Sequence, residues 1–439
     1  MSLKKLFLFL FLIGNVTAVV LFWWQNSNAL FSNTAGSLIA LGRLAGLFAE
    51  LSIATQFLLM GRISFVEQEF GHDKLNRLHR YIGYSIGVFL LSHPTLLILG
   101  YSQSEGKTFF GQITEFLLNY EDVFKAAIGL IILIAIISIS LPFFRKQLKY
   151  EHWYGVHLFV YLVFILIIQH QTNFGDFEGR RAWVLYWQIL NYGIVGLLVL
   201  HRFIRPLYRF YYHGFVLDKI IPETPDATSL YISGHNLEGF KFKPGQFANL
   251  TFLNKKMFFT HPFSFSLPQN GKSIRFSVKA SGDFTNKIRQ LPIGTKVIIE
   301  GPLGRFTQDP APQADKFLFL AGGIGITPIR SLIESLAGQN KDIVLLYSNK
   351  RPEDILFKTE LENLKHRYHF IMTQVVEKPG QEQYETGRID REKILRLVPD
   401  FKLREIYICG PIEMIDALKN LLLNLGANKD KIHFEKFSY

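Results

Sequence analysis

Four histidines stand at the ends of two apolar segments, where titratable side chains are costly. The segments are "HRYIGYSIGVFLLSH" at 79–93 and "HLFVYLVFILIIQH" at 157–170. Their histidines are 14 and 13 residues apart, which is roughly 20 Å along a helix at about 1.5 Å per residue. Two helices running in the same direction would oppose His79 to His157 at one depth and His93 to His170 at another. Two facing imidazoles are what axial coordination of a haem iron by paired histidines requires.

An alternative interpretation is that each histidine is a polar side chain hydrogen-bonded between packed helices, since such bridges are common in membrane proteins. Four histidines at matched depths favour metal ligation, because polar residues in membrane spans are costly and usually functional. The second segment complicates ligation, since thirteen residues of regular helix place His157 and His170 about 140° apart. We therefore expect a local distortion of that helix, or ligation from two different sides.

Long apolar runs in the first half of the chain must carry these histidines. A helix needs about 20 apolar residues to cross the hydrocarbon core of a bilayer. The candidate spans are residues 4–24, 38–60, 79–100, 123–142, 153–170 and 183–204. The first run is too long for a signal peptide and is not followed by an A-x-A-like site, so we expect a retained helix.

Basic residues flank these spans in a regular pattern. They cluster before the first span, between the second and third, between the fourth and fifth, and after the sixth. The positive-inside rule then places both termini and the second half of the chain in the cytoplasm. The same flanks account for much of the formal net charge of +12, so no nucleic-acid partner is expected. The sequence predicts a multi-pass protein of the cell membrane, in contact with the lipid bilayer.

The second span contains two charged residues, Arg43 and Glu50. They are seven residues apart and so lie on nearly the same helical face. One interpretation is a salt bridge or packing contact within the membrane. The other places Arg43, near the outer end of the span, beside a haem propionate or the electron acceptor.

After about residue 210 the pattern changes to short alternating segments separated by Gly and Pro, such as "LYISGHN", "QFANLTFL" and "SIRFSVKA". This pattern predicts an antiparallel barrel or sandwich. Within it lie "HPFSFS" at 261–266 and "SGDFT" at 281–285. A helix beginning in the second motif would direct free N–H groups toward a diphosphate. Each motif alone could equally be a turn.

From about residue 315, strands alternate with helices, which predicts a doubly wound parallel sheet. "KFLFLAGGIGITPIRSLIESL" reads as a strand, a glycine-rich turn and a helix. Gly322, Gly323 and Gly325 would let the backbone approach a phosphate at the N-terminus of that helix. After the next strand, "DIVLLYS", Lys350 and Arg351 could neutralise a 2′-phosphate, which favours NADP over NAD, or could form a solvated loop.

A third strand, "EIYICGP", ends at Cys409, Gly410 and Pro411. Ligands of such sheets bind in the crevice at the carboxyl ends of the strands, although Cys409 could also be a small buried residue. As the single cysteine, it excludes an intramolecular disulfide and a cysteine metal cluster. The chain ends in "HFEKFSY", where Phe437 could be a hydrophobic latch or stack on a flat cofactor ring.

The motifs "HPFSFS", "SGDFT", "GGIGITP", "CGP" and the terminal "FEKF", in this order, resemble the ferredoxin–NADP reductase-like module. Joined to six spans with four histidines, nearly the whole chain resembles the ferric reductase and NADPH oxidase superfamily, including its bacterial oxidases. We therefore expect a multi-domain protein. Its parts are an all-α six-helix transmembrane haem domain at 1–210, an antiparallel β-barrel FAD domain at 211–312 and an α/β doubly wound NAD(P)-binding domain at 313–439.

The resemblance implies two b-type haems, FAD and NADPH, with NADH as an alternative donor. His79 and His157 would ligate an inner haem, His93 and His170 an outer one, and Arg43 would lie near the outer haem. The flavin would contact His261, Pro262, Phe263 and Ser264, and its diphosphate would lie near Lys279, Gly282 and Thr285. The NADPH phosphates would be held by Gly322, Gly323, Gly325, Thr327 and Pro328. Cys409, followed by Gly410 and Pro411, would lie near the nicotinamide, and Phe437 would cover the isoalloxazine until nicotinamide displaces it.

The expected function is a transmembrane oxidoreductase that passes electrons from cytosolic NADPH through FAD and two haems to O2, giving superoxide. A ferric or cupric chelate reductase is the alternative enzyme; a membrane-anchored haem or flavin sensor and an electron donor to a periplasmic protein are further alternatives. Leu97 stands where animal oxidases often have another histidine, so their oxygen-reduction site does not transfer directly. The sequence has no EF-hand loop or SH3-ligand segment, so no obligatory regulatory subunit is expected.

Overall fold

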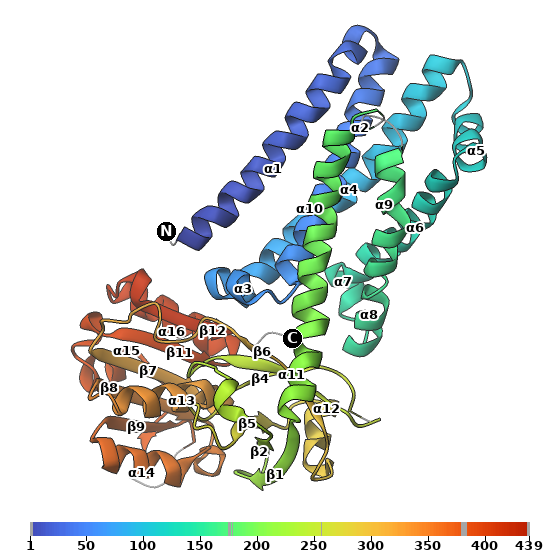
Figure 1. Ribbon diagram of the computed structural model, residues 1–439. Coiled ribbons are helices and arrows are strands. Elements are labelled where there is room, and N and C mark those ends of the chain that lie inside the picture. Colours follow the sequence, from blue (N-terminus) through green and yellow to red (C-terminus); the bar gives the residue numbers. More distant parts are fainter. Residues whose placement is uncertain (1–2, 174–176, 178, 256, 379–383, 437–439) are drawn as a thin grey trace. The chain divides into compact units, whose positions relative to one another are not determined.

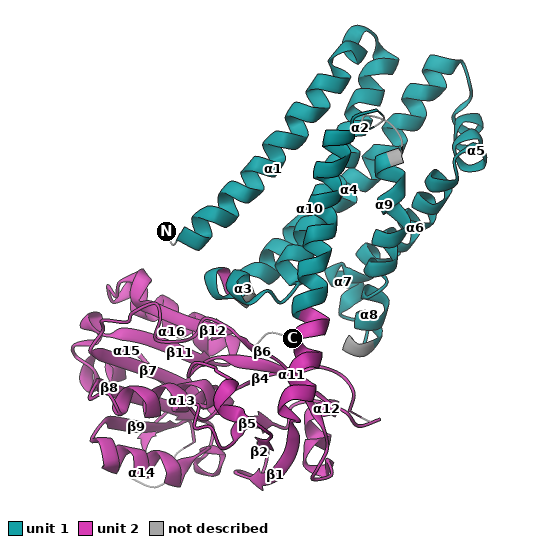
Figure 2. Cartoon of the chain, in the orientation of Figure 1, with its two compact units in different colours: residues 1–69, 74–201 teal, residues 70–73, 202–439 magenta. Residues whose placement is uncertain are grey.

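The computed structural model describes residues 3–173, 177, 179–255, 257–378 and 384–436 (Figure 1). The chain divides into two compact units (Figure 2), one of residues 1–69 and 74–201 and the other of residues 70–73 and 202–439. The domain boundaries expected after residues 210 and 312 stay predictions.

The first unit is helical. Among the described residues, six helical segments are long and apolar enough to cross a membrane. Each of them contains or overlaps one of the predicted spans, which confirms the six-helix prediction. The segments are built from α1 (Leu3–Ser27), α2 (Thr34–Met60), α4 (His72–Glu105), α6 (Glu121–Ser140), α8 (Tyr150–His157) with α9 (Val160–Asn173), and α10 (Arg181–Val199). The sequence interpretation did not include the shorter helices α3 (Ser64–Phe70), α5 (Phe109–Asn119) and α7 (Pro142–Arg145).

The fifth span is interrupted directly after one of its histidines. Helix α8 ends at His157, and α9 begins at Val160. Between them, the amide of Phe159 donates to the carbonyl of Val156 at 3.1 Å, and the amide of Tyr161 donates to that of Leu158 at 3.1 Å. These bonds join an amide to the carbonyl three residues earlier, as in a 3₁₀ helix, which winds more tightly than an α-helix. They therefore change the directions in which the side chains on either side of the interruption point. This is a local distortion of the kind expected from the 13-residue spacing.

The sixth span continues through a π-type stretch (Leu200–Ile204) into α11 (Arg205–His213). Gly214 ends α11 with a φ of +58°, a left-handed conformation that glycine adopts at little cost. The first strand of the second unit follows at Val216.

Six antiparallel strands follow in two three-stranded sheets, with the orders β1-β2-β5 and β4-β3-β6. The strands are β1 (Val216–Pro222), β2 (Ala227–Ser233), β3 (Phe247–Phe252), β4 (His261–Ser264), β5 (Ile274–Lys279) and β6 (Val297–Leu303). Bridges at Val216–Lys296 and Phe265–Phe276 join the sheets at both seams. The alternating pattern therefore forms a barrel, as predicted, around a phenylalanine-rich core.

The last part of the chain forms a six-stranded parallel sheet in the order β10-β9-β8-β7-β11-β12. Its strands are β7 (Lys316–Gly322), β8 (Asp342–Asn349), β9 (Ile371–Val376), β10 (Glu385–Thr386), β11 (Glu405–Gly410) and β12 (Ile432–Lys436). The chain starts at β7 and adds β8 on one side and β11 on the other, which puts the topological switch point between β7 and β11. The predicted doubly wound sheet is confirmed.

Alternation along β7 explains why helices cover both faces of this sheet. Phe317, Phe319 and Ala321 belong to a core cluster that includes residues of α13 (Ile326–Ala337) and α14 (Lys358–Tyr368). Leu318 and Leu320 belong to a second cluster, with residues of α15 (Arg391–Leu397) and α16 (Ile412–Asn424). Strands buried on both faces read as continuous apolar runs, as "KFLFLAG" does.

Candidate cofactor sites

The four histidines of the membrane spans form two facing pairs. The ring centroids of His79 and His157 are 6.0 Å apart, and those of His93 and His170 are 6.1 Å apart, with an interplanar angle of 63° in both pairs. Metal–imidazole bonds are about 2 Å long. Two such bonds, extended by the distance from each nitrogen to its ring centre, account for these separations. The side chains therefore fit one iron between each pair.

Helix α2 fixes the orientation of His93. The Nδ1 atom of His93 lies 2.8 Å from the carbonyl oxygen of Gly42, and since a carbonyl can only accept, Nδ1 carries the proton. Nε2 is then the nitrogen with a free lone pair that could bind a metal, as in histidine ligands held by an outer-shell carbonyl. A Cβ at Gly46 would lie 2.6 Å from the same Nδ1, so α2 needs glycine to approach this ring.

Two of the other histidines, His79 and His170, each offer a ring nitrogen that has no hydrogen-bond partner among the described residues. In both, this nitrogen is the buried Nδ1 atom. Trp153 stacks on His157 with ring centroids 5.0 Å apart, and Gln56 Nε2 donates to the backbone carbonyl of His79 at 2.8 Å. No group of three or more His, Cys, Asp or Glu side chains suited to a bare metal ion is found among the described residues. A porphyrin needs only two nitrogens from the protein.

Arg43 lies next to Gly42, at the level of the outer histidine pair. Its Nη2 donates to the hydroxyl of Tyr101 at 3.3 Å. Glu50 is only 2 % exposed, and its oxygens accept no hydrogen bond from the described residues. A salt bridge between Arg43 and Glu50 is therefore not formed, and the position of Arg43 near an outer haem stays a prediction.

The two motifs expected at the flavin lie together in the barrel. The ring of His261, the first residue of β4, contacts that of Phe284 in "SGDFT" with centroids 3.9 Å apart. Pro262 and Phe263 follow on the same strand, and the buried hydroxyl of Ser264 makes no hydrogen bond to the described residues. An unpaired buried hydroxyl at the end of this strand fits a polar edge of the flavin, because buried polar groups rarely lack a partner.

The residues expected near the FAD diphosphate are grouped, but some already have partners. Lys279 at the end of β5 forms an ion pair with Asp226 at 3.0 Å. The Thr285 hydroxyl accepts hydrogen bonds from the amides of Ser281 at 2.9 Å and Gly282 at 3.0 Å. A helix does begin after Gly282, as expected, but α12 (Asp283–Lys287) is only five residues long.

The glycine-rich turn lies against the carboxyl end of β11. A Cβ on Gly325 would be 2.2 Å from the carbonyl oxygen of Cys409, and one on Gly410 would be 3.1 Å from the Cα of Gly322. Only glycine permits this approach of two backbones. Gly323 differs, since its φ is +51° and the space beside it is open, which leaves room for a phosphate at the start of α13.

Thr327 and Pro328 lie in the first turn of α13, and both are buried. The Thr327 hydroxyl donates to the carbonyl of Ile324 at 2.9 Å, so it stabilises the turn itself. Lys350 and Arg351 follow directly after β8 and are exposed, and Arg351 lies 3.9 Å from Glu353. Their position at the carboxyl end of a strand next to β7 is the one that a 2′-phosphate site requires.

Cys409 is fully buried at the end of β11, and Pro411 follows Gly410 at the start of α16. Burial, reinforced by the charge of Glu435, raises the pKa of the Cys409 thiol well above its ordinary value. Glu435 pairs in register with Cys409 across β11 and β12. The sequence prediction missed Glu435, because only the strand pairing brings the two together. Phe437 lies outside the described residues.

The burial of Cys409 predicts that its thiol is inert in the folded protein. Because the thiolate is the reactive form, iodoacetamide at pH 8 should label the folded wild type far more slowly than the protein unfolded in denaturant, counted by intact mass. Leu403→Cys, at a side chain that is 64 % exposed, is the matched control and should be labelled quickly. Fast labelling of Cys409 in the folded protein would contradict its placement.

Comparisons with known proteins agree with this arrangement. Residues 45–168 match the family described as ferric reductase like transmembrane component. Residues 223–307 match an FAD-binding domain, and residues 319–420 match an oxidoreductase NAD-binding domain. The first match contains or borders all four paired histidines, and the other two cover most of the barrel and the parallel sheet.

The chain is also similar to individual proteins over its second half. It is 31 % identical over 231 residues to the glycine betaine monooxygenase reductase subunit of Chromohalobacter salexigens, covering 50 % of this chain and 62 % of that protein. It is 30 % identical over 226 residues to an NADPH oxidoreductase of Mycobacterium tuberculosis, covering 49 % of this chain and 57 % of that protein. The chain thus spans less than two thirds of the length of these relatives.

Among solved structures, the FAD/NAD-binding domain of nitric oxide dioxygenase from Vibrio cholerae matches with a TM-score of 0.46 and 22 % identity, covering 51 % of this chain and 97 % of that chain. Taken with the fold, the three family matches give the chain an architecture similar to that of the ferric reductase and NADPH oxidase superfamily. In this architecture a ferric reductase-like transmembrane component precedes a ferredoxin–NADP reductase-like module. The chain thus combines a region like the ferric reductase transmembrane component with regions that match an FAD-binding domain and an oxidoreductase NAD-binding domain.

Proposed function

We propose that this protein passes electrons from cytosolic NADPH through FAD and two haems to an acceptor on the far side of the membrane, with O2 giving superoxide. The observation that carries the proposal is that the four histidines form two facing pairs. The ring centroids are 6.0 Å apart in one pair and 6.1 Å apart in the other. When bound, NADPH supplies a hydride, FAD divides its two electrons into single transfers, and the haem irons relay them. The protein supplies position, potential and exclusion of water.

The chain's own residues have distinct tasks in this proposal. His79 and His157 would hold an inner haem, and His93 and His170 an outer one. Because each iron would be held by two imidazoles of the protein, the acceptor would be reduced without binding to the metal. Arg43, next to the contact between Gly42 and His93, would attract an anionic acceptor or product at this level.

The donor site would lie at the carboxyl ends of β7, β8 and β11. The glycine-rich turn would hold the NADPH phosphates, the exposed Lys350 and Arg351 would favour a 2′-phosphate, and Cys409 would lie near the nicotinamide. NADH is the alternative donor. The basic residues between the spans favour a cell-membrane protein whose termini and second unit face the cytoplasm.

A ferric or cupric chelate reductase is the second candidate, and one observation favours it. Leu97 occupies the position where animal oxidases often have a further histidine, and a Cβ on Gly42 would lie 2.9 Å from its side chain. The outer end of α4 is therefore apolar and closely packed at that point. An electron donor to a periplasmic protein is the third candidate.

The acceptor can be identified with purified protein supplied with haem, FAD and NADPH. For an oxidase we expect reduction of cytochrome c that superoxide dismutase suppresses, together with oxygen consumption. Fast anaerobic reduction of a ferric chelate with little oxygen consumption would instead support the chelate reductase. Slow turnover with both acceptors would point to a protein partner, and the lack of any Soret band would refute the haem assignment.

A further inference from the structure

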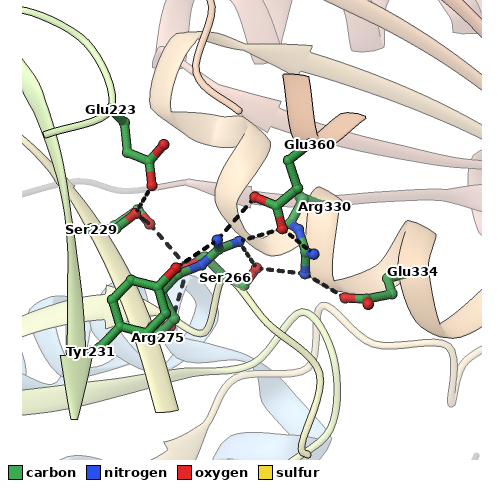
Figure 3. A network of polar contacts seen from close by, with 9 residues as sticks. Glu223, Ser229, Tyr231, Ser266, Arg275, Arg330, Glu334 and Glu360 are labelled. Atoms are coloured by element: carbon green, nitrogen blue, oxygen red, sulfur yellow. Dashed lines mark hydrogen bonds and ion pairs between the residues drawn. The ribbon is translucent and has the colours of Figure 1, made fainter. Parts of the chain in front are cut away.

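A buried ionic cluster joins the barrel to the parallel sheet within the second unit (Figure 3). Arg275 of β5 is 4 % exposed and Arg330 of α13 is 2 % exposed. Glu360 of α14 lies between them. It accepts two hydrogen bonds from Arg275, at 2.9 and 3.2 Å, and forms an ion pair with Arg330. Arg330 also binds Glu334 at 2.6 Å.

Both arginines share a further partner, the backbone of Ser266. Arg275 Nη2 donates to the Ser266 carbonyl at 2.9 Å, and Arg330 Nη1 donates to the same oxygen at 3.1 Å. Arg275 Nε donates to the Ser266 hydroxyl at 3.0 Å. The contact therefore joins one backbone position of the barrel to one helix of the sheet through rigid, planar guanidinium groups.

These contacts lie directly beside the two expected cofactor motifs. Ser266 is two residues beyond Ser264, within "HPFSFS", and Arg330 is two residues beyond Pro328, in the helix that follows the glycine-rich turn. A shift of α13 and α14 relative to the barrel would break the bonds of Arg330 to Ser266 and of Glu360 to Arg275. The distance between β4, which carries the expected flavin motif, and α13, which follows the glycine-rich turn, thus depends on this cluster.

The charges within the cluster resist such a shift. Two buried cations face the carboxylates of Glu360 and Glu334. Burial opposes the charge of Arg275, but Glu360 raises its pKa above the ordinary value, whereas burial dominates for Arg330 and lowers its pKa. Both remain cationic near neutral pH because the ordinary value is so high. Separating them from Glu360 would leave buried charges uncompensated, which is strongly unfavourable.

The barrel side of the cluster is extended by hydroxyl groups. The Ser266 hydroxyl lies 3.0 Å from that of Ser277, which lies 2.8 Å from that of Ser229, and Ser229 donates to Glu223 at 2.6 Å. Phe357, just before α14, packs its ring 4.5 Å from the Arg275 guanidinium. The cluster is therefore held by several strands of the barrel. Residues that position a functional site must themselves be held in place by such supporting contacts.

We propose that Arg275, Arg330 and Glu360 are positioning residues for hydride transfer, which hold the nicotinamide site of the sheet at reacting distance from the flavin site of the barrel. This rests on the proposed function only for its first step, the reduction of FAD by NADPH. It does not depend on the haems or on the acceptor.

The test is the reduction of bound FAD in the full-length protein, followed by stopped flow over a range of NADPH concentrations. Arg330→Met should lower the limiting rate constant by about a hundred-fold, since displacement by about 1 Å can cost that much. The Kd for NADPH should change little, because Arg330 touches no expected phosphate ligand. The long-wavelength charge-transfer absorbance of the complex should weaken.

Arg404→Met is the matched control. Arg404 is also buried and binds two carboxylates, Asp342 at 2.9 Å and Asp400 at 2.7 Å. It lies at the amino ends of β7 and β8, away from the expected site. This variant should lose thermal stability and keep the limiting rate constant. An equal rate loss in Arg404→Met, or an unchanged rate in Arg330→Met, would overturn the positioning role.

Glu360→Gln decides the question if Arg330→Met does not fold with bound flavin. It preserves the shape of the side chain and removes the charge that both arginines share, so a lowered limiting rate with a native flavin spectrum supports the proposal. An unchanged rate refutes it. A wild-type protein whose flavin is reduced but whose haem is not would contradict only the proposed electron path. A wild-type flavin that neither NADPH nor NADH reduces would refute both proposals.

Discussion

His93→Ala is expected to remove about half of the haem bound by the purified protein and to abolish electron delivery to any external acceptor. Each facing pair is proposed to hold one iron, and His93 is one of the two imidazoles of its pair, 6.1 Å from His170 between ring centroids. The other pair remains intact, so half of the bound haem should survive. NADPH should still reduce the flavin, which lies before the haems in the proposed path.

Haem stoichiometry by the pyridine haemochrome method, with the Soret band as a second readout, measures this loss. His170→Ala should reproduce the effect, because it removes the opposite ligand. His152→Ala is the matched control, since His152 is exposed and lies in the same span as His157 and His170, and it should retain full haem content. Unchanged haem content in His93→Ala would disprove the ligand assignment.

Gly325→Ala is expected to weaken NADPH-dependent flavin reduction by about five- to 150-fold. The added Cβ would lie 2.2 Å from the carbonyl oxygen of Cys409 and 2.4 Å from its carbonyl carbon, and neither backbone atom can rotate away. Forcing an extra methyl into a closely packed site costs about 1–3 kcal/mol, and each 1.4 kcal/mol corresponds to about ten-fold. This unfavourable contact would destabilise the glycine-rich turn that is proposed to hold the NADPH phosphates.

Gly338→Ala at the other end of α13 is its control. Both glycines have right-handed helical backbones, with φ values of −61° for Gly325 and −64° for Gly338, so alanine is conformationally acceptable at each. A Cβ on Gly338 would meet nothing closer than 3.6 Å, and the substitution should be neutral. Titration with NADP+ and the kinetics of flavin reduction measure both variants. Equal behaviour of the two would contradict the packing of the turn against Cys409.

The sequence was most informative where a feature is periodic or local. Apolar runs long enough for a bilayer predicted the six spans, and the alternation of strands with helices predicted the doubly wound parallel sheet. The histidine spacing predicted both the pairing of residues and the need for a distortion. The position of that distortion, directly after His157, could not be predicted, because it depends on how neighbouring helices pack.

What the sequence could not reveal depends on contacts between distant residues. The carbonyl of Gly42 that orients His93 belongs to the backbone and leaves no trace in a side-chain pattern. No motif in the sequence marks Arg275 or Arg330 as buried, yet tertiary contacts bury both. Glu435 becomes a neighbour of Cys409 only through the register of β11 and β12.

The hydrogen bond from His93 to Gly42 would link the chemistry of the proposed outer iron to the position of a neighbouring helix. A stronger bond at Nδ1 makes the imidazole a better electron donor and lowers the reduction potential of the metal it ligates. Since the acceptor of this bond is a main-chain atom, no side-chain substitution at position 42 can remove it. A displacement of α2 along α4, by a lipid or by an inhibitor, would instead alter its length. The driving force of the last electron transfer would then respond to mechanical strain in the bilayer.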